Sequence, residues 1–332
     1  MKKLIIILFS ITTLFSQSKV GTSAAQFLGI GIGPAAVGMG GATTSLATDA
    51  SILYWNPGGI SRLSTSQVQF AKTNWLVDTE INLFATVIKL DGSNSLGLYL
   101  MQLDYGKEEI TDLEHQNGNG LYWKASDLVF GLAYARNLTD RFSFGGTGKV
   151  IHQQIHNEKS SGVAIDMGLL YNAPDDNYRL GMSISNFLGS DLFMDGKDLY
   201  RKIDLDPDAE GHNETIVAKM KTDPWPLPLI FRVGLSSNLI KNETVRFTVA
   251  TDAIIPSDDV ETLNLGTEVA FLERVFIRAG YSNIGNEYSE EGLSVGAGVK
   301  VFTSGMSTSI DYTNQNFGMF GNIPHWGINI SF

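Results

Sequence analysis

Most of the chain alternates apolar and polar residues with a period of two. Between Leu293 and Val301 the odd-numbered residues are apolar and the even-numbered ones are Ser, Gly or Lys, and residues 163–171 and 245–252 repeat the pattern. Successive side chains of a β-strand point to opposite faces, so each segment predicts a strand with one apolar face. Beyond residue 17 no apolar run reaches the ~20 residues that a membrane-spanning helix needs. The pattern leaves two architectures, a soluble β-sandwich or a transmembrane barrel.

The lengths of the connections separate these two architectures. About fourteen strand candidates can be counted, starting near residues 65, 79, 94, 125, 141, 161, 177, 228, 244, 261, 274, 291, 305 and 322. The even-numbered connections are tight, as at residues 91–93, whereas the odd-numbered ones include the long segments 104–124 and 188–227. Short periplasmic turns on one rim and long loops on the other are typical of outer-membrane barrels. We therefore expect an all-β, transmembrane outer-membrane antiparallel β-barrel of about 14 strands over residues 65–332, with both termini periplasmic.

Both ends of the chain carry signals that agree with this fold. Residues 1–17 combine two lysines, an apolar run and a small or polar end, which is the layout of a secretory signal peptide. The chain ends in a strand pattern whose Phe terminus resembles the signal read by the barrel-assembly machinery, and we assign this role to Trp326, Ile328, Ile330 and Phe332. The sequence thus predicts a location in the bacterial outer membrane, where membrane lipids surround the barrel and a closed wall pairs every backbone donor.

Composition excludes several classes of function. The net charge of -11 argues against nucleic acid as a partner, because phosphate backbones are bound by basic surfaces. The chain has no cysteine, which excludes a disulfide framework, a thiolate zinc site and a Cys nucleophile. The five histidines and scattered serines form no visible triad. We expect no catalytic residue, metal or cofactor, and an outer-membrane enzyme is only a third alternative.

Three short motifs resemble ligand sites but lack a required feature. Residues 29–38, GIGIGPAAVG, suggest a dinucleotide loop, yet no strand precedes them. Residues 204–214 space acidic residues as a calcium loop does, but Ala209 stands where Gly is needed. His152 and His156 fall at a strand end, about 13 Å apart at ~3.3 Å per residue, so they cannot share one ion.

Residues 18–64 form a glycine-rich and aromatic stretch before the first strand. The lumen of a barrel with about 14 strands is too wide for its own side chains to fill, so we expect this stretch to fold inside as a hatch. Glycine allows close backbone approach, Tyr and Trp offer amphipathic packing surface, and Asn-Pro-Gly-Gly encodes a tight turn into the first strand. The residues expected to build the hatch are Gly38, Gly40, Gly41, Asp49, Tyr54, Trp55, Asn56, Pro57, Gly58 and Gly59.

A family resemblance rests on the same stretch. Residues 24–63 contain FLGIGIG, GMGGA, an Asp-Ala pair and YWNPGG, and residues 277–282 and 292–301 add IRAGYS and GLSVGAGVKV. Together they resemble the PorV/PorQ family of outer-membrane proteins, relatives of the FadL-type barrels. Two departures are Gly58 in place of the usual Ala and Pro34-Ala35 in place of a basic motif. The resemblance implies a 14-stranded barrel with an N-terminal plug.

The family contains two kinds of function, and the sequence favours one of them. PorV-like members serve type IX secretion beside a large translocon barrel and accept secreted cargo, whereas FadL-like members carry hydrophobic compounds through a gap in the wall. The inward strand faces that can be identified in the sequence are dominated by Gly, Ser, Thr, Asp and Arg rather than by a continuous apolar track. This composition favours a non-enzymatic secretion partner that binds the translocon or its cargo. The alternative is a channel for hydrophobic small molecules, with an apolar pocket near Phe27, Tyr54 and Trp55.

The candidate partner surface is the long segment 188–227, which leads into DPWPLPL at residues 223–229. Trp225 and Pro226 form a rigid apolar anchor of the kind that protein interfaces use. The alternative for Trp225 is a place in the aromatic girdle at the membrane boundary. The two assignments stay open at the level of sequence.

Overall fold

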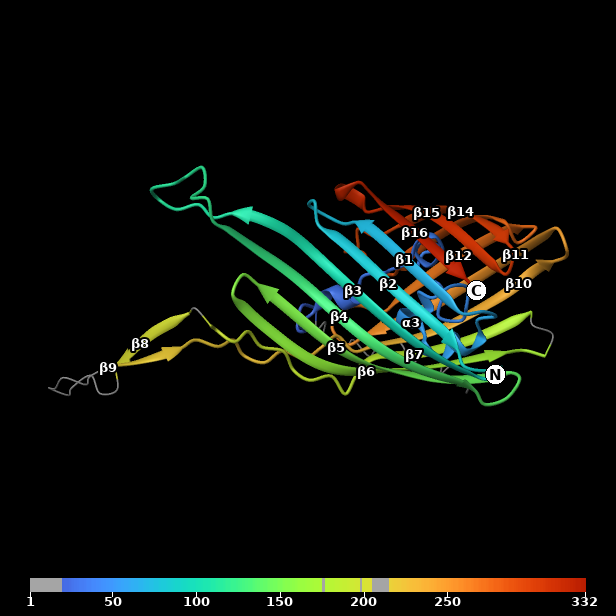
Figure 1. The fold of residues 1–332 in the computed structure, drawn as a ribbon, viewed down its shortest axis with the longest axis horizontal. Coiled ribbons are helices and arrows are strands. Elements are labelled where there is room, and N and C mark those ends of the chain that lie inside the picture. Colours follow the sequence, from blue (N-terminus) through green and yellow to red (C-terminus); the bar gives the residue numbers. More distant parts are fainter. Residues whose placement is uncertain (1–19, 175–176, 198, 205–214) are drawn as a thin grey trace, which may run out of the picture.

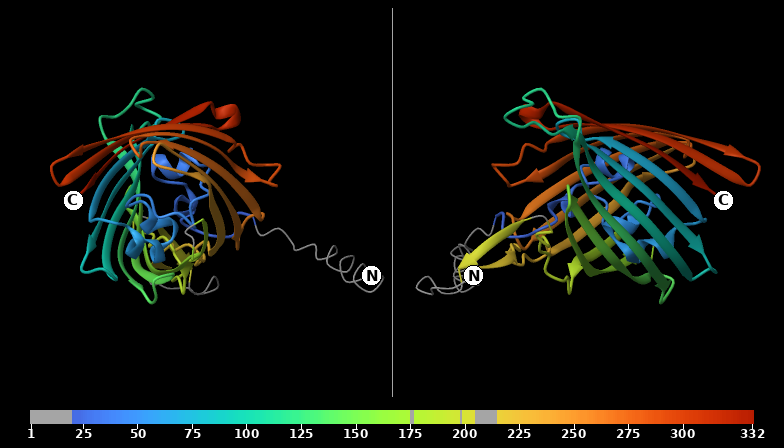
Figure 2. Two further views of the ribbon diagram at one scale, coloured as in Figure 1. Left: turned by 90° about the vertical axis from the view of Figure 1, so that its right-hand side faces the viewer. Right: turned by 60° about the vertical axis from the view of Figure 1, so that its left-hand side comes forward.

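Fourteen antiparallel strands close into one barrel in a computed structural model that describes residues 20–174, 177–197, 199–204 and 215–332 (Figures 1 and 2). Each strand pairs with its neighbours in the barrel, and the first strand pairs with the last. The predicted fold class is therefore confirmed. The predicted signal peptide, residues 1–17, lies outside the described residues.

The barrel strands follow the chain in order, with one excursion between the seventh and the eighth. They are β1 (Gln67–Asn74), β2 (Glu80–Lys89), β3 (Asn94–Glu109), β4 (Tyr122–Asn137), β5 (Phe142–Ile155), β6 (Glu158–Asn172), β7 (Tyr178–Phe187), β10 (Ile230–Lys241), β11 (Val245–Pro256), β12 (Thr262–Phe271), β13 (Val275–Ile284), β14 (Leu293–Thr303), β15 (Met306–Asn316) and β16 (Asn322–Ser331). The excursion carries a separate hairpin of β8 (Tyr200–Asp204) and β9 (Thr215–Lys219), which projects away from the barrel (Figure 1).

Short helices occur mainly before the first strand. They are η1 (Gln26–Gly29), α2 (Pro34–Gly38), α3 (Ile52–Trp55) and η2 (Pro57–Arg62), and η3 (Gly318–Phe320) follows β15. Among the described residues, no helix has the length and apolarity to cross a membrane.

The two rims of the barrel differ in the length of their connections. The short-turn rim carries tight turns such as Leu272–Glu273, where both residues adopt positive φ of 53° and 51°. The long-connection rim carries residues 110–121 and 188–229. One connection at this rim departs from the expected pattern, because β6 continues past its neighbour β7 and joins β5 through His156 and Asn157 alone. The strand expected near residue 161 therefore begins at Glu158.

The outer wall is apolar, as the alternating pattern predicts. Leu293, Val295 and Val299 are each about half exposed, whereas Ser294 between them is fully buried. On β16 the outward face carries Trp326, Ile328 and Ile330, and Phe332 follows with its backbone N–H donating to the carbonyl of Ser66 at 2.9 Å. The assignment of these four residues as a barrel-assembly signal stays a prediction.

The inner wall is divided into an apolar and a polar half. On β2 to β4 the inward residues are mostly apolar or small, and with Ile151 of β5 they join one buried cluster with the residues before β1; the cluster includes Ile81, Leu83, Val87, Tyr99, Met101, Leu103, Val129 and Ile151. The other buried inward residues of β5 are Ser143, Gly145, Thr147 and Lys149. On β10 to β16 the inward residues are polar or charged and include Arg232, Asp252, Glu268, Arg278, Asp311 and His325. The expectation of small and polar inward faces was wrong for β2 and β3, because strands that are apolar on both faces lose their alternation.

Residues 20–66, named here the N-terminal segment, cross the lumen from one rim to the other. At the long-connection rim the N–H of Ala24 donates to the carbonyl of Pro226 at 2.8 Å. At the short-turn rim the guanidinium of Arg62 donates to the carbonyls of Thr139 and Asp140. The described chain thus begins near the long-connection rim and ends at the short-turn rim. The expectation that both termini are periplasmic concerns an N-terminus that lies outside the described residues.

Gly58 offers a test of how closely the N-terminal segment fits the wall. A Cβ at this position would lie 2.5 Å from the carbonyl oxygen of Gly168 on β6. We expect Gly58→Ala to lower the free energy of unfolding by about 1–3 kcal/mol, because backbone on both sides leaves no room to relax. Urea unfolding in lipid vesicles, followed by Trp fluorescence, measures this change. Gly92→Ala is the control, since nothing lies within 4 Å of its Cβ position; equal midpoints for both variants would contradict the fit.

Candidate functional site

Tyr54 and Trp55 hold the N-terminal segment together in the middle of the lumen. Their rings meet edge to face, with centroids 5.2 Å apart. The Tyr54 hydroxyl donates to the carbonyl of Leu28 at 2.8 Å, and the Trp55 Nε1 donates to that of Ile32 at 3.0 Å. From the wall, the guanidinium of Arg232 lies 5.8 and 5.5 Å from the two ring centroids. The two aromatic residues therefore join the segment to itself and to β10.

Asn56 shapes the chain where a tight turn was expected. Its Oδ1 accepts from the N–H of Gly58 at 3.0 Å, and its Nδ2 donates to the carbonyls of Thr44 and Leu169 at 2.7 and 2.8 Å. This side chain caps the six-residue helix η2, which begins at Pro57. The four residues Asn56 to Gly59 form a tight turn, in which the N–H of Gly59 donates to the carbonyl of Asn56 at 2.9 Å. This turn is the start of η2, and β1 follows at Gln67.

The glycines of GMGGA lie against the polar half of the wall. Gly40 has φ of 62°, and a Cβ there would lie 2.6 Å from the backbone nitrogen of Tyr281 on β13. Gly38 faces Thr313 and Arg278, Gly41 packs on the Trp55 ring, and Gly59 packs on Ile52. The segment thus approaches β12 to β15 with its backbone rather than with apolar side chains.

Asp49 is a buried carboxylate of the N-terminal segment that faces the short-turn rim. Its Oδ1 accepts from the backbone N–H and the hydroxyl of Ser51, at 2.9 and 2.5 Å. Burial raises the pKa of Asp49 above its ordinary value, and the hydrogen bonds from Ser51 oppose this rise. The carboxylate lines a cavity together with charged residues of the wall.

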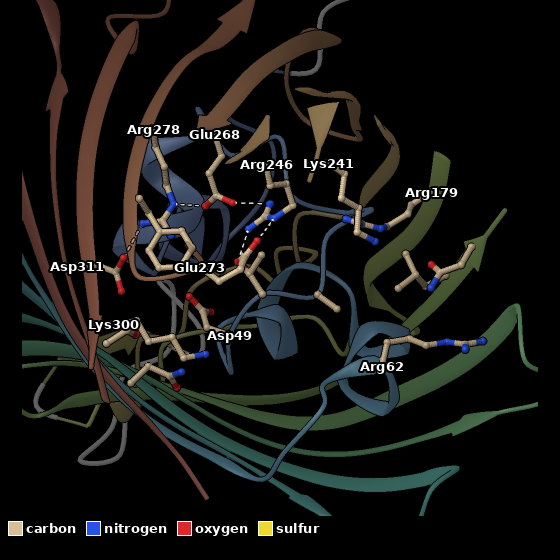
Figure 3. Close-up of a pocket in the computed structure, with 17 residues that line it drawn as sticks. Asp49, Arg62, Arg179, Lys241, Arg246, Glu268, Glu273, Arg278, Lys300 and Asp311 are labelled. Carbon is tan, nitrogen blue, oxygen red and sulfur yellow. Dashed lines mark hydrogen bonds and ion pairs between the residues drawn. The ribbon is translucent and has the colours of Figure 1, made fainter. Parts of the chain in front are cut away.

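This inner cavity of about 360 Å³ lies between the N-terminal segment and the short-turn rim (Figure 3). An ion-pair network forms one side of it. Arg246 bridges Glu268 at 2.8 Å and Glu273 at 2.7 Å, and Arg278 bridges Glu268 at 2.6 Å and Asp311 at 2.5 Å. The other charged residues of the lining are Asp49, Arg62, Arg179, Lys241 and Lys300.

A second cavity, the outer cavity of about 270 Å³, lies between the N-terminal segment and the long-connection rim. Its lining is mixed. The charged residues are Arg232, Asp258, Asp259 and Glu291, several Asn, Gln, Ser and Thr side chains are neutral and polar, and the apolar side chains include Ile30, Val37, Trp55, Trp75, Ile230 and Ile254. Arg232 is only 3% exposed and donates to the hydroxyl of Ser185 at 3.1 Å. Burial raises the pKa of Glu291, in the connection after β13, to about 7.

Sequence reasoning missed both cavities and most of their residues. The inward charges carried a signal, since Arg232 and Arg278 stand at polar positions of alternating strands. The apolar lining residues carried no such signal, because the inward Ile254 and the outward Ile255 are the same residue type and adjacent in the sequence.

Trp225 and Pro226 lie apart from the hatch residues, at the long-connection rim. The backbone N–H of Trp225 donates to the carbonyl of Leu192, and the N–H of Leu192 donates to the carbonyl of Trp225, each at 2.8 Å. Trp225 is 46% exposed. The carbonyl of Pro226 accepts a hydrogen bond from the N–H of Ala24. The long connection is thereby fastened to the start of the N-terminal segment while the indole stays accessible.

The remaining motifs form no ligand cluster in the described part of the chain. His152 lies on β5 with its Nδ1 2.8 Å from the Ser161 hydroxyl, and His156 occupies the turn that follows. No group of three or more metal-ligating side chains occurs among the described residues. The calcium-like loop of residues 204–214 lies almost wholly outside them.

Several solved structures share this architecture. CymD, a monoaromatic hydrocarbon channel, matches 91% of this chain and 98% of its own, with 14% identity and a TM-score of 0.59. The toluene transporter TodX of Pseudomonas putida matches 90% and 96%, with 14% identity and a TM-score of 0.56. A Pseudomonas aeruginosa FadL homologue matches 89% and 96%, with 10% identity and a TM-score of 0.51. The chain has a FadL-type barrel fold.

These likenesses concern the fold alone. No protein-family model matches the sequence, and no curated protein sequence matches it either. The function of this FadL-type barrel must therefore be argued from its cavities.

Arg278 offers a test of the ion-pair network in the inner cavity. Its side chain is nearly buried, and Arg278→Met would leave Asp311 without its partner and Glu268 with one arginine instead of two. We expect a loss of about 3–5 kcal/mol in the free energy of unfolding, because a buried carboxylate loses its counter-charge. Urea unfolding in vesicles measures it. Arg274→Met, at an exposed turn four residues earlier, should cost less than about 1 kcal/mol; similar losses would show that the network adds no stability.

Proposed function

We propose that this FadL-type barrel is a non-enzymatic outer-membrane channel that takes up hydrophobic small molecules. Its outward apolar face fits a lipid bilayer, and its fold is that of channels for hydrocarbons. In this orientation the long-connection rim faces the outside of the cell and the short-turn rim faces the periplasm.

The outer cavity carries the proposal. It lies inside a closed wall on the long-connection side of the N-terminal segment, and indole and aliphatic side chains such as Trp55, Trp75 and Ile230 line much of it. Ligand pockets are concave and combine apolar surface with convergent polar groups, and here the polar groups are the charged residues Arg232, Asp258, Asp259 and Glu291 together with neutral Asn, Gln, Ser and Thr side chains. A small hydrophobic molecule leaving water would gain by burying its surface there.

Passage beyond the outer cavity requires the N-terminal segment to shift. Its contacts with β2 to β5 bury a large apolar cluster, whereas its contacts with β12 to β15 are made by glycine backbone. Separation from the glycine side exposes less apolar surface and therefore costs less free energy. We propose that the segment pivots on its apolar side and opens toward β12 to β15.

Two adjacent isoleucines of β11 provide a matched test. Ile254 lines the outer cavity, and Ile255 points outward and is 44% exposed. Ile254→Asn should weaken binding of toluene by about tenfold, because a polar amide in an apolar pocket costs about 1–2 kcal/mol. Binding can be followed by quenching of Trp fluorescence, and uptake by toluene entry into vesicles that contain the protein.

Ile255→Asn should leave toluene binding within about twofold of the natural protein, since this residue lies near the membrane boundary outside the pocket. If both variants bind toluene as the natural protein does, or if the natural protein does not bind it, the outer cavity is not the site of uptake.

A role as a secretion partner is a second candidate, supported by the exposed Trp225 on the connection that carries β8 and β9 (Figure 1). An exposed indole fixed by backbone bonds is suited to anchor a partner protein. In this case gently extracted protein should co-purify with a larger translocon barrel or with secreted cargo, and Trp225→Ser should reduce the yield of partner severalfold. Tyr288→Ser, at a 91% exposed residue of another long connection, is the control. Recovery of the natural protein alone would count against a secretion role.

A further inference from the structure

We propose that the inner cavity is a binding site for a small polyanion that carries phosphate or carboxylate groups. The cavity opens at the short-turn rim and is separate from the outer cavity, so this inference does not depend on what the outer cavity binds. Three observations carry it: the charge of the lining, the fixed network on one side, and the lysines on two sides of the central space.

The charge of the lining is opposite in sign to that of the whole protein. Six cationic and four anionic side chains line the cavity, which gives it a formal charge of +2 in a chain whose net charge is -11. A concave site with charge of one sign concentrates ligands of the other sign, because its low-dielectric walls focus the field. The sign of the lining therefore selects an anion.

The ion-pair network supplies a fixed side for this site. Arg246 and Arg278 each join two carboxylates, and they share Glu268, so the network has five residues. These residues come from β11, β12, β13, β15 and the turn after β12. Because their charges are already paired within the wall, these groups shape the cavity more than they attract a ligand. The carboxylates that could repel an anion are held by arginines.

The lysines are the groups that would hold the anion. Lys241 ends β10 and Lys300 lies on the inward face of β14, and Figure 3 shows them on two sides of the central space. Among the described residues, no carboxylate forms an ion pair with either ammonium. Arg62 adds a guanidinium to the lining, with backbone carbonyls among its partners. An anion between these groups would accept charge-assisted hydrogen bonds from both sides.

Asp49 is the acidic residue of the lining outside the network. Its Oδ1 is occupied by Ser51, and burial raises its pKa, which weakens its negative charge toward an incoming anion. The uncharged residues Ser309 and Asn329 also line the cavity. The electrostatic repulsion of an anion at the centre of the cavity is therefore weaker than the number of acidic residues suggests.

Isothermal titration of the full-length protein in detergent, with pyrophosphate and separately with citrate, tests the proposal. The titrations should be made at low ionic strength, where salt screens the charges of the lysines and the anion least. We expect saturable binding, and at least about tenfold weaker binding for the double variant Lys241→Gln/Lys300→Gln, since it removes two charge-assisted hydrogen bonds. Tighter binding of pyrophosphate would identify a phosphate ligand, and tighter binding of citrate a carboxylate ligand.

The matched control is Lys107→Gln/Lys124→Gln, which removes the same charge from exposed residues near the long-connection rim. It should bind within about twofold of the natural protein. Heat-dependent gel migration confirms that each variant retains the folded barrel. Absence of binding by the natural protein, or equal weakening in the two double variants, would overturn the proposal.

Discussion

The whole structure depends on the pairing of β1 with β16. This seam joins Gln67 to Ser331 and continues to Thr73 and His325, and Phe332 extends it by a bond to Ser66. A strand edge left open in lipid would carry unpaired backbone groups, so the sheet must close. Closure with fourteen strands sets a lumen wider than the inward side chains can fill. The N-terminal segment supplies the missing interior.

The division of the lumen follows from how that interior is filled. Against β2 to β5 the segment packs apolar side chains such as Phe27, Leu53 and Ile60, and the contact is dense. Against β10 to β16 the wall carries charged residues, which must satisfy one another through cross-strand pairs such as Glu268 and Arg278. Charged groups need space and hydration, and both cavities accordingly lie on this side. Stability and ligand access are thus assigned to opposite halves of one lumen.

The outer wall could be predicted from the sequence because its signal is local. The period of two in Leu293 to Val301 and the tight turn at Leu272–Glu273 need no knowledge of distant contacts. The lumen could not be predicted in this way. That Glu268 stands opposite Arg278, or that Ala24 reaches Pro226, depends on strand register and on the path of the N-terminal segment. The helix capped by Asn56 likewise depends on carbonyls of Thr44 and Leu169, one of which lies 113 residues away.

The path of the N-terminal segment constrains the order of assembly. Because Ala24 lies at one rim and Arg62 at the other, the segment is threaded through the finished ring of strands. A ring that closed first would have to admit this segment end-on, past glycine contacts such as Gly58 against Gly168 that leave no clearance. Strands that gather around a segment already docked on β2 to β5 meet no such obstacle. The seam between β1 and β16 is then the last contact to form, and the completed ring encircles a chain that it cannot release sideways.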